Sequence, residues 1–161
     1  MTIAVGDKLP DASFKVVGSD GVRDVSTAEL FDGQKVVLFG VPGAFTPPCH
    51  RNHLPGFLDN LDALKANGVD RVAVVSTNDH WVMNAWSEAT GGSGQIDYLA
   101  DGSVTFIHAI GMENDLSGAG LGTRTKRFSM IVDDGLVKAV NIEQVRGEVA
   151  NSGVAKILEE L

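Results

Sequence analysis

A single cysteine, Cys49, carries the most distinctive chemistry in this 161-residue chain. It follows Thr46, Pro47 and Pro48, which end a loop rich in glycine and proline. Threonine is a good helix N-cap, and proline suits the first helical position because its missing N–H would be unbonded there. The sequence therefore predicts that Cys49 lies in the first turn of a helix. Free backbone N–H groups and the helix dipole favour a thiolate there, and the thiolate is the nucleophilic form of cysteine.

Because the chain has one cysteine, all sulfur chemistry must involve this residue. An intramolecular disulfide framework, a Cys-rich zinc site and a Cys-x-x-Cys dithiol are excluded. Cys49, His50 and His53 could suggest a metal site, but adjacent side chains diverge around a helix and no fourth ligand is evident. We therefore expect no metal and no cofactor. A lone cysteine is more often a buried apolar residue than a nucleophile, so its surroundings must decide between the two.

The charge balance argues against several classes of partner. Asp and Glu number 21 and Lys and Arg 13, a formal net charge of −8, which disfavours phosphate backbones and anionic membrane surfaces. We therefore expect neither nucleic acid nor a membrane as partner. The segment from Met1 to Asp7 lacks the basic and apolar regions of a targeting signal, and no apolar run approaches membrane-spanning length. The expected compartment is the cytoplasm, which is reducing and keeps a thiol reduced.

Alternating apolar segments predict the elements that must position Cys49. A continuous apolar run at residues 36–39 indicates a strand buried on both faces, at the centre of a sheet. Apolar residues at helical spacing from 54 to 64 and a second buried strand at 71–76 complete a βαβ unit, whose crossover is almost always right-handed. The other expected strands lie at 14–17, 22–25, 98–99, 128–132 and 136–142. Four further helices are expected: a short one that begins with a capping box at 26–29, one that begins after Asn78 or Asp79, and two at 104–108 and 154–161.

Residues 116–122 form a Gly-rich segment that superficially resembles a dinucleotide-binding loop. No predicted strand leads into it, no helix clearly leaves it, and its third glycine is misplaced. We therefore expect a connection between elements there and not a cofactor site.

One segment resembles the Pro-x-x-x-Thr-x-x-Cys active-site loop of peroxiredoxins: Pro42-Gly43-Ala44-Phe45-Thr46-Pro47-Pro48-Cys49. Its residues from Pro42 to Pro47 are similar to those of the type II, or peroxiredoxin-five, subfamily. Residues 53–57, 76–79, 82–86, 99–102, 116–118 and 127–135 resemble further blocks of that subfamily in the same order. The resemblance implies one thioredoxin-like domain over residues 1–161, an α/β fold with a central mixed sheet flanked by helices and an N-terminal β-hairpin. The implied activity is the reduction of hydroperoxides.

The resemblance also implies roles for individual residues. Cys49 resembles the peroxidatic cysteine, whose thiolate attacks one peroxide oxygen and becomes a sulfenic acid. Thr46 would hold the peroxide with its hydroxyl, and Pro42 would shield the thiolate from water. Arg127 would polarise the peroxide and stabilise both the thiolate and the departing oxygen. Arg124 is the alternative arginine, and the motif match favours Arg127.

Other conspicuous side chains have simpler explanations. His50 stands where many relatives carry a small polar residue, and its imidazole could tune the thiolate, but we expect it to face solvent. Trp81, Met83 and Trp86 are expected to pack in the core or in an interface.

The single cysteine constrains the catalytic cycle. Some subfamily members carry a second, resolving cysteine, but the corresponding segments here, residues 149–152 and 72–76, hold none. A sulfenic acid at Cys49 must then be reduced by an external thiol. We expect glutathione with a glutaredoxin in this role, and a thioredoxin as second choice, with hydrogen peroxide and alkyl hydroperoxides as substrates. The resemblance also implies a homodimer.

A redox sensor or binding module of the same fold is the alternative function. In a sensor, Cys49 would oxidise once for each reduction by its partner, whereas an enzyme would consume excess peroxide when supplied with a small thiol. A dithiol oxidoreductase is excluded by the cysteine count alone.

Overall fold

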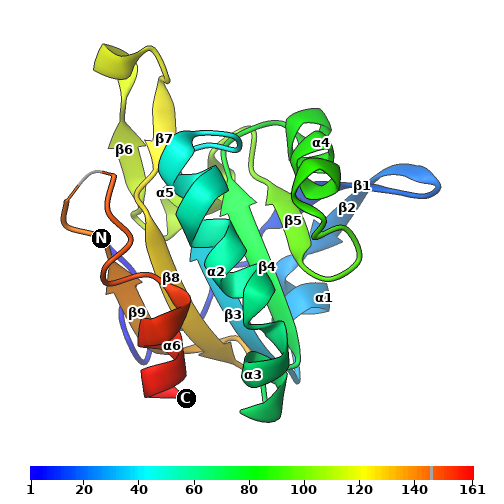
Figure 1. The fold of residues 1–161 in the computed structure, drawn as a ribbon, viewed down its shortest axis with the longest axis vertical. Coiled ribbons are helices and arrows are strands. Elements are labelled where there is room, and N and C mark those ends of the chain that lie inside the picture. Colours follow the sequence, from blue (N-terminus) through cyan, green and yellow to red (C-terminus); the bar gives the residue numbers. More distant parts are fainter. Residues whose placement is uncertain (146) are drawn as a thin grey trace.

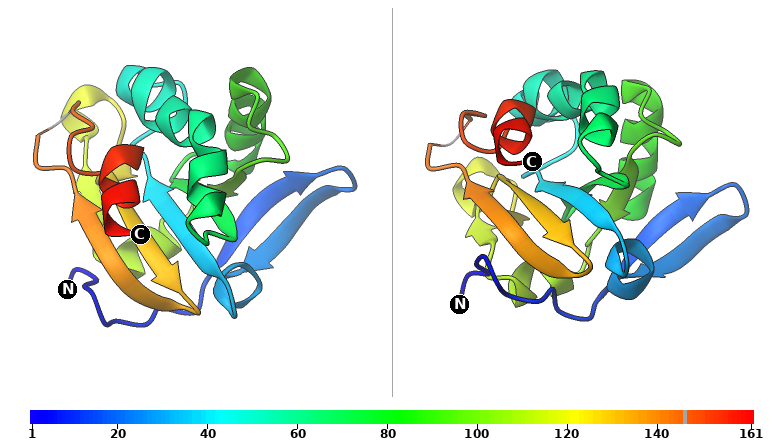
Figure 2. Two further views of the ribbon diagram at one scale, coloured as in Figure 1. Left: turned by 60° about the horizontal axis from the view of Figure 1, so that its bottom comes forward. Right: turned by 90° about the horizontal axis from the view of Figure 1, so that it is seen from below.

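The computed structural model describes residues 1–145 and 147–161, which form a seven-stranded mixed sheet with helices on both faces (Figure 1; two further views in Figure 2). The strand order is β2-β1-β5-β4-β3-β8-β9. The strands are β1 (Ser13–Gly18), β2 (Gly21–Ser26), β3 (Lys35–Gly40), β4 (Arg71–Ser76), β5 (Asp97–Ala100), β8 (Phe128–Asp133) and β9 (Leu136–Ile142). The α/β fold, the mixed sheet and the N-terminal hairpin of β1 and β2 are confirmed.

The helices lie in two layers. They are α1 (Thr27–Phe31), α2 (Leu54–Asp59), α3 (Leu61–Ala66), α4 (His80–Thr90), α5 (Thr105–Ala109) and α6 (Val154–Glu160). None of these helices is long and apolar enough to cross a membrane.

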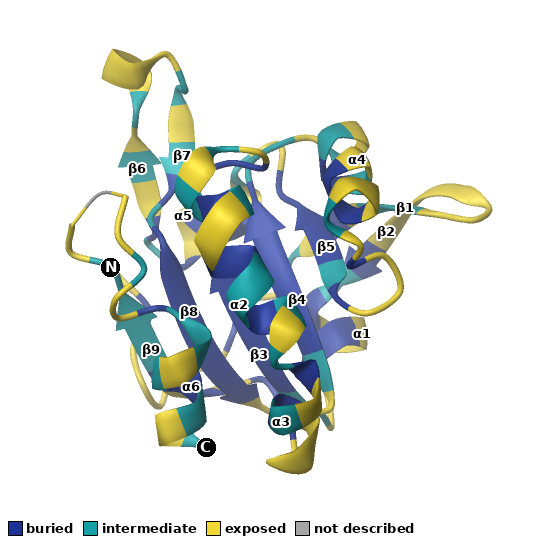
Figure 3. Cartoon of the chain, viewed as in Figure 1, coloured by how far each residue is buried: buried dark blue, intermediate teal, exposed yellow. Residues whose placement is uncertain are grey.

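Strand β3 lies inside the sheet, as predicted from its apolar run. It pairs parallel with β4 and antiparallel with β8. Every residue from Val36 to Gly40 is buried, because helices cover both faces of the sheet at this place (Figure 3). The loop that precedes Cys49 directly follows the carboxyl end of β3.

Alternate side chains of β3 enter two separate hydrophobic cores, as the two-residue period of a strand requires. Val37 and Phe39 pack in the core beneath α2, α3, α4 and α6, where Trp86 and Met83 are also buried. Val36 and Leu38 pack on the opposite face, with α1 and α5. The predicted core role of Trp86 and Met83 is confirmed, whereas Trp81 is exposed.

The long helix expected after Cys49 is divided into shorter pieces. A π-helical turn at Cys49–His53 precedes α2, and α2 ends before α3 begins at Leu61. Asn60 occupies the break, with φ of −116°, and its side-chain amide donates to the Gly56 carbonyl. A side chain that hydrogen-bonds to the backbone in this way competes with helix continuation.

The Gly-rich segment forms the outer end of a small antiparallel ribbon. Strands β6 (Glu113–Asp115) and β7 (Thr123–Thr125) pair with each other, and a short 3-10 turn at Ser117–Ala119 lies between them. These strands were not predicted, because three residues are too short for a periodic pattern to be recognised.

Side-chain caps determine where two helices begin. Ser26 and Glu29 form the predicted capping box at α1. Asp79 caps α4 by accepting a hydrogen bond from the Val82 N–H. Asn78, the alternative cap, has its side chain turned toward the loop before Cys49 instead.

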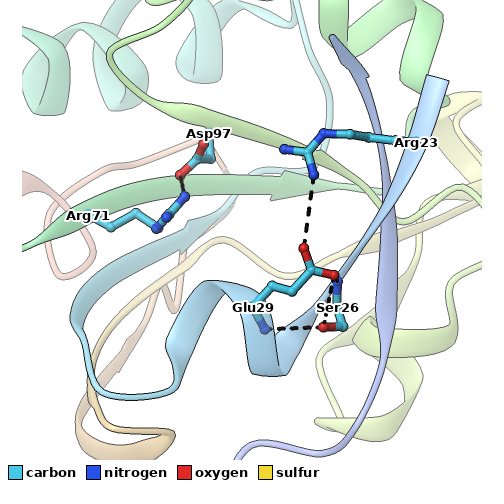
Figure 4. A network of polar contacts seen from close by, with 5 residues as sticks. All are labelled: Arg23, Ser26, Glu29, Arg71 and Asp97. Carbon is cyan, nitrogen blue, oxygen red and sulfur yellow. Dashed lines mark hydrogen bonds and ion pairs between the residues drawn. The ribbon is translucent and has the colours of Figure 1, made fainter. Parts of the chain in front are cut away.

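A set of polar contacts joins α1 and the strands near it (Figure 4). Arg23 lies 4.0 Å from the Glu29 carboxylate, and Arg71 pairs with Asp97 at 2.6 Å, which links β4 to β5. Arg71 begins β4, so these contacts lie at the opposite end of the parallel strands from Cys49. Partly exposed ion pairs of this kind contribute little to stability, about 0–1 kcal/mol each.

A methyl group at Gly40 should collide with the ring of Phe128, its partner in β8. A Cβ at Gly40 would lie 2.1 Å from Phe128 Cε1. We expect Gly40→Ala to lower the free energy of unfolding, measured by urea denaturation, by about 1–3 kcal/mol, the usual cost of overpacking. Gly56→Ala is the matched control. Gly56 lies in α2, and a Cβ there would lie 3.5 Å from Val154 Cγ1, an ordinary van der Waals contact. Equal effects of the two substitutions would contradict this packing.

Candidate active site

Cys49 lies at the start of a helical segment that follows the carboxyl end of β3. Pro47 and Pro48 are already helical, and Thr46 directly precedes them, so the predicted helix start is confirmed. The turn that contains Cys49 is wider than expected, because the Leu54 N–H bonds to the Cys49 carbonyl five residues back. Cys49 itself is completely buried.

Within the described part of the chain, the Cys49 sulfur has two polar contacts. Arg127 Nη2 donates to Sγ at 3.0 Å, and Thr46 Oγ1 lies 3.0 Å from Sγ. Arg127 directly precedes β8, is only 7% exposed and holds a permanent positive charge against the sulfur. A guanidinium at this distance forms a charge-assisted hydrogen bond with the sulfur. The cysteine is therefore buried, but in a polar contact set that an apolar packing residue does not have.

The Thr46 hydroxyl contacts both the Cys49 sulfur and the backbone of its own loop. It donates to the Gly43 carbonyl at 2.6 Å while its oxygen faces Cys49 Sγ. A hydroxyl has one hydrogen and two lone pairs, so it can donate to only one of these partners at a time. Thr46 thus stands at the helix start as predicted, with its hydroxyl oxygen 3.0 Å from the sulfur.

His53 orients Arg127 from the other side. Its Nδ1 lies 3.0 Å from Arg127 Nη1, and its Nε2 lies 2.9 Å from the Ser152 carbonyl. A carbonyl only accepts and a guanidinium only donates, so His53 carries its proton on Nε2. Burial, together with the charge of Arg127, lowers the pKa of His53 from 6.5 to about 3. His53 is therefore neutral at pH 7, and both ring nitrogens are engaged.

The role of His53 was missed in the sequence, where it was considered only as a metal ligand. The available signal was its spacing of four residues from Cys49, which places both side chains on one side of a helical turn. That spacing does not reveal Arg127, which is 74 residues away in the chain.

Arg124, the alternative arginine, contacts the loop and not the sulfur. Its Nη1 donates to the Pro42 carbonyl at 3.1 Å, and its Nε donates to the Leu121 carbonyl at 2.8 Å. Between the two candidates, Arg127 is the one that contacts Cys49.

The loop before Cys49 is also fixed from the side of β4. Asn78 Oδ1 accepts the Ala44 N–H at 2.9 Å and the Ser76 hydroxyl at 2.5 Å. The next residue, Phe45, adopts a left-handed φ of 63°, which L-residues rarely occupy. Arg124 and Asn78 therefore both hold the backbone of a loop that contains one strained residue.

His50 points partly into the protein, so the expectation that it faces solvent holds only in part. Its Nδ1 accepts a hydrogen bond from buried Trp86 Nε1 at 3.0 Å, and its ring stacks on Phe45 with centroids 5.5 Å apart. The residue is half-buried. These contacts fix the ring of the residue next to the cysteine and engage its Nδ1 with Trp86.

A cavity of about 600 Å³ opens beside this contact set. Pro42, Thr46 and Arg127 are among the residues that line it. The rest of its wall is formed by Pro47, Pro48, Asn114, Leu116, Ala119, Leu121, Lys126, Ile142, Glu143, Gln144, Val145 and Gly147. The four residues predicted for the site thus converge, with Cys49, Thr46 and Arg127 in direct contact and Pro42 on the cavity wall.

Comparisons with known proteins agree with this geometry. The Redoxin family model matches residues 4–158. Peroxiredoxin-2C of Oryza sativa subsp. japonica is 46% identical over 160 residues, which cover 99% of this chain and 98% of the relative. The chain belongs to the type II peroxiredoxins. The chloroplastic Peroxiredoxin-2E-2 of the same organism is 47% identical over 165 residues, 99% of this chain and 73% of the relative.

A solved structure shows the same likeness in three dimensions. Reduced Prx3 from Vibrio vulnificus, in complex with hydrogen peroxide, has a TM-score of 0.92 and 44% sequence identity, with 98% of each chain covered. This peroxiredoxin is accordingly a thiol-dependent peroxidase with a thioredoxin-like fold.

The buried neutral His53 should make the folded peroxiredoxin sensitive to acid. Because its pKa is lowered from 6.5 to about 3, the unfolded chain takes up a proton that the folded chain does not. Stability should therefore fall from pH 6.5 toward pH 3, with a loss attributable to His53 of about 2 kcal/mol between pH 7 and pH 5. Urea denaturation of the wild type and of His53→Gln at both pH values isolates this contribution. An equal loss in both proteins would contradict it.

Proposed function

We propose that this peroxiredoxin reduces hydroperoxides through Cys49, with Arg127 and Thr46 as catalytic residues. The observation that supports the proposal is that Arg127 Nη2 and Thr46 Oγ1 each lie 3.0 Å from the buried sulfur. The thiolate attacks one peroxide oxygen, an S–O bond forms, and the O–O bond breaks. The electron pair of that bond leaves with the other oxygen, which takes a proton to give water or an alcohol. The sulfur is oxidised to a sulfenic acid and the peroxide is reduced.

The roles of the surrounding residues follow from the movement of charge. Negative charge passes from sulfur to the departing oxygen, so donors fixed along that path stabilise the transition state. The guanidinium of Arg127 is such a donor and keeps its charge throughout. The Thr46 oxygen can accept a hydrogen bond from the peroxide O–H while the Thr46 hydroxyl donates its own hydrogen to the Gly43 carbonyl. Pro42 shields the thiolate from water on the cavity side.

The substrates we propose are hydrogen peroxide and alkyl hydroperoxides. A cavity of about 600 Å³ is much larger than hydrogen peroxide needs. Much of its wall is apolar, including Leu116, Leu121 and Ile142. Such a wall accommodates the alkyl group of an organic hydroperoxide while the peroxide end meets Arg127.

We propose glutathione with a glutaredoxin as the reductant, and a thioredoxin as second choice. The chain has no second cysteine, so the sulfenic acid must meet an external thiol. Cys49 is completely buried, and a small thiol enters the cavity more readily than a protein surface does. The cytoplasm is the proposed compartment because it supplies reduced thiols.

A homodimer is proposed from the large apolar side chains near the active-site loop. Phe45 is 47% exposed and Trp81 is 62% exposed. They lie on neighbouring segments, since Ala44, which precedes Phe45, is bonded to Asn78 just before α4. Contact with a second copy would remove these side chains from water.

Removing the guanidinium from the sulfur should slow peroxide reduction strongly. We expect Arg127→Met to lower the second-order rate constant with hydrogen peroxide by about 10²–10³-fold, as loss of one transition-state donor does. Stopped-flow tryptophan fluorescence measures the rate, and Cys49→Ser should abolish the signal. Arg51→Met is the matched control, because it removes an exposed positive charge from the turn that contains Cys49. A wild-type rate in Arg127→Met would exclude the proposed role.

The reductant can be tested with peroxide in excess. We expect turnover with glutathione and glutaredoxin to exceed turnover with a thioredoxin system by at least about tenfold, because a small thiol reaches a buried sulfenic acid more readily than a protein surface does. NADPH consumption measures both rates, and intact mass should show glutathione bound at Cys49. Equal rates with thioredoxin alone would refute this choice. Oxidation without turnover under either system would favour the redox sensor.

A further inference from the structure

The carboxylate of Glu143 accepts hydrogen bonds from the backbone of residues 150–152, a segment close to the active site. Glu143 follows β9, and its oxygens accept the N–H groups of Ala150, Asn151 and Ser152 at 2.7–3.0 Å and the Ser152 hydroxyl at 2.5 Å. Burial opposes ionisation, but the hydrogen bonds from Ser152, Asn151 and Ala150 hold the pKa of Glu143 below its ordinary value. A single ionised side chain thus fixes the position of three consecutive residues.

That segment ends on the contact that orients the active-site arginine. The Ser152 carbonyl accepts the His53 Nε2 proton at 2.9 Å, and His53 Nδ1 accepts from Arg127 Nη1 at 3.0 Å. The Glu143 N–H also donates to the Arg127 carbonyl at 2.9 Å. The backbone and the guanidinium of Arg127 are therefore both connected to Glu143, one directly and the other through Ser152 and His53.

We propose that Glu143 is a positioning residue for the peroxidase reaction, acting through Ser152 and His53 to hold the Arg127 guanidinium against the Cys49 sulfur. The inference rests on the proposed role of Arg127. An arginine side chain has several rotatable bonds, so a guanidinium held only by the sulfur would sample other directions. Small displacements of a catalytic group cost large factors in rate, which makes its anchor part of catalysis.

The Glu143→Gln substitution tests this anchor with little change in volume. Its amide has one oxygen, so an NH₂ group must face either the Ser152 donors or the Ala150 and Asn151 N–H groups. Glu160→Gln is the matched control, because it removes the same charge from α6, where Glu160 accepts a hydrogen bond from Asn141 on the surface. Each protein is measured by stopped-flow oxidation with hydrogen peroxide, thiolate absorbance at 240 nm and thermal unfolding.

We expect Glu143→Gln to lower the rate constant about ten- to a hundredfold and to reduce thiolate absorbance at pH 7. Glu160→Gln should stay within about twofold of the wild type in both measurements. A folded Glu143→Gln protein with wild-type rate and absorbance would overturn the proposal.

A double-mutant cycle separates positioning from general destabilisation. If Glu143 acts through Arg127, then Glu143→Gln should have almost no further effect on the rate in an Arg127→Met background. An equal loss in both backgrounds would overturn the proposal while leaving the peroxidase function intact. A slow wild-type protein would instead contradict the proposed function itself.

If Glu143→Gln does not fold, Ser152→Ala and Glu143→Asp carry the test. Ser152→Ala removes one hydrogen bond to Glu143 but keeps the carbonyl that His53 uses. We expect a fall in rate of about two- to fivefold, absent in the Arg127→Met background. Glu143→Asp keeps the acceptor oxygens and should be faster than any folded variant without a carboxylate. A wild-type rate in folded Ser152→Ala, or a rate in Glu143→Asp no higher than in a folded variant without a carboxylate, would exclude the proposed role.

Discussion

The contact between a buried guanidinium and a buried sulfur is the constraint on which the rest of this site depends. Removing a positive charge from water costs several kcal/mol unless partners compensate for it. For Arg127 the partners are the Cys49 sulfur and the lone pair of His53. A protonated His53 would face the guanidinium with a like charge, so His53 must remain neutral. The fold meets this condition by burying His53 and by giving its other nitrogen a carbonyl acceptor.

The wide turn at Cys49–His53 brings both partners to the same cation. Cys49 and His53 leave one helical turn, and the guanidinium reaches both with different nitrogens. Turns of this type are uncommon and recur at functional sites. They give up the regular backbone hydrogen bonds of an α-helix and place side chains where a regular helix would not. Buried apolar residues of α2 follow immediately and anchor the turn to the sheet, with Leu54 and Phe57 packed in the core. The chemistry at the sulfur therefore depends on packing that begins one residue later.

Local and distant features of the site differed in how far the sequence could predict them. Cys49, Thr46 and Pro47 are neighbours, so residue types and spacing alone fixed their order around the helix start. The buried strands were predictable for the same reason, since their apolar runs are continuous. The contacts of His53 join residues 74 and 99 positions apart, and no local pattern encodes such separations. The break at Asn60 and the short ribbon of β6 and β7 depend on individual hydrogen bonds.

The donors around Cys49 are held by residues that do not touch the sulfur. Gly43 fixes the Thr46 hydroxyl, and Asn78 and Arg124 hold the loop between them. Because these bonds form on folding, the cost of orienting the donors has been met before a peroxide arrives. A solvent shell would have to reorganise as charge moves from sulfur to oxygen, whereas fixed donors do not. The outer contacts therefore position the groups that face the sulfur.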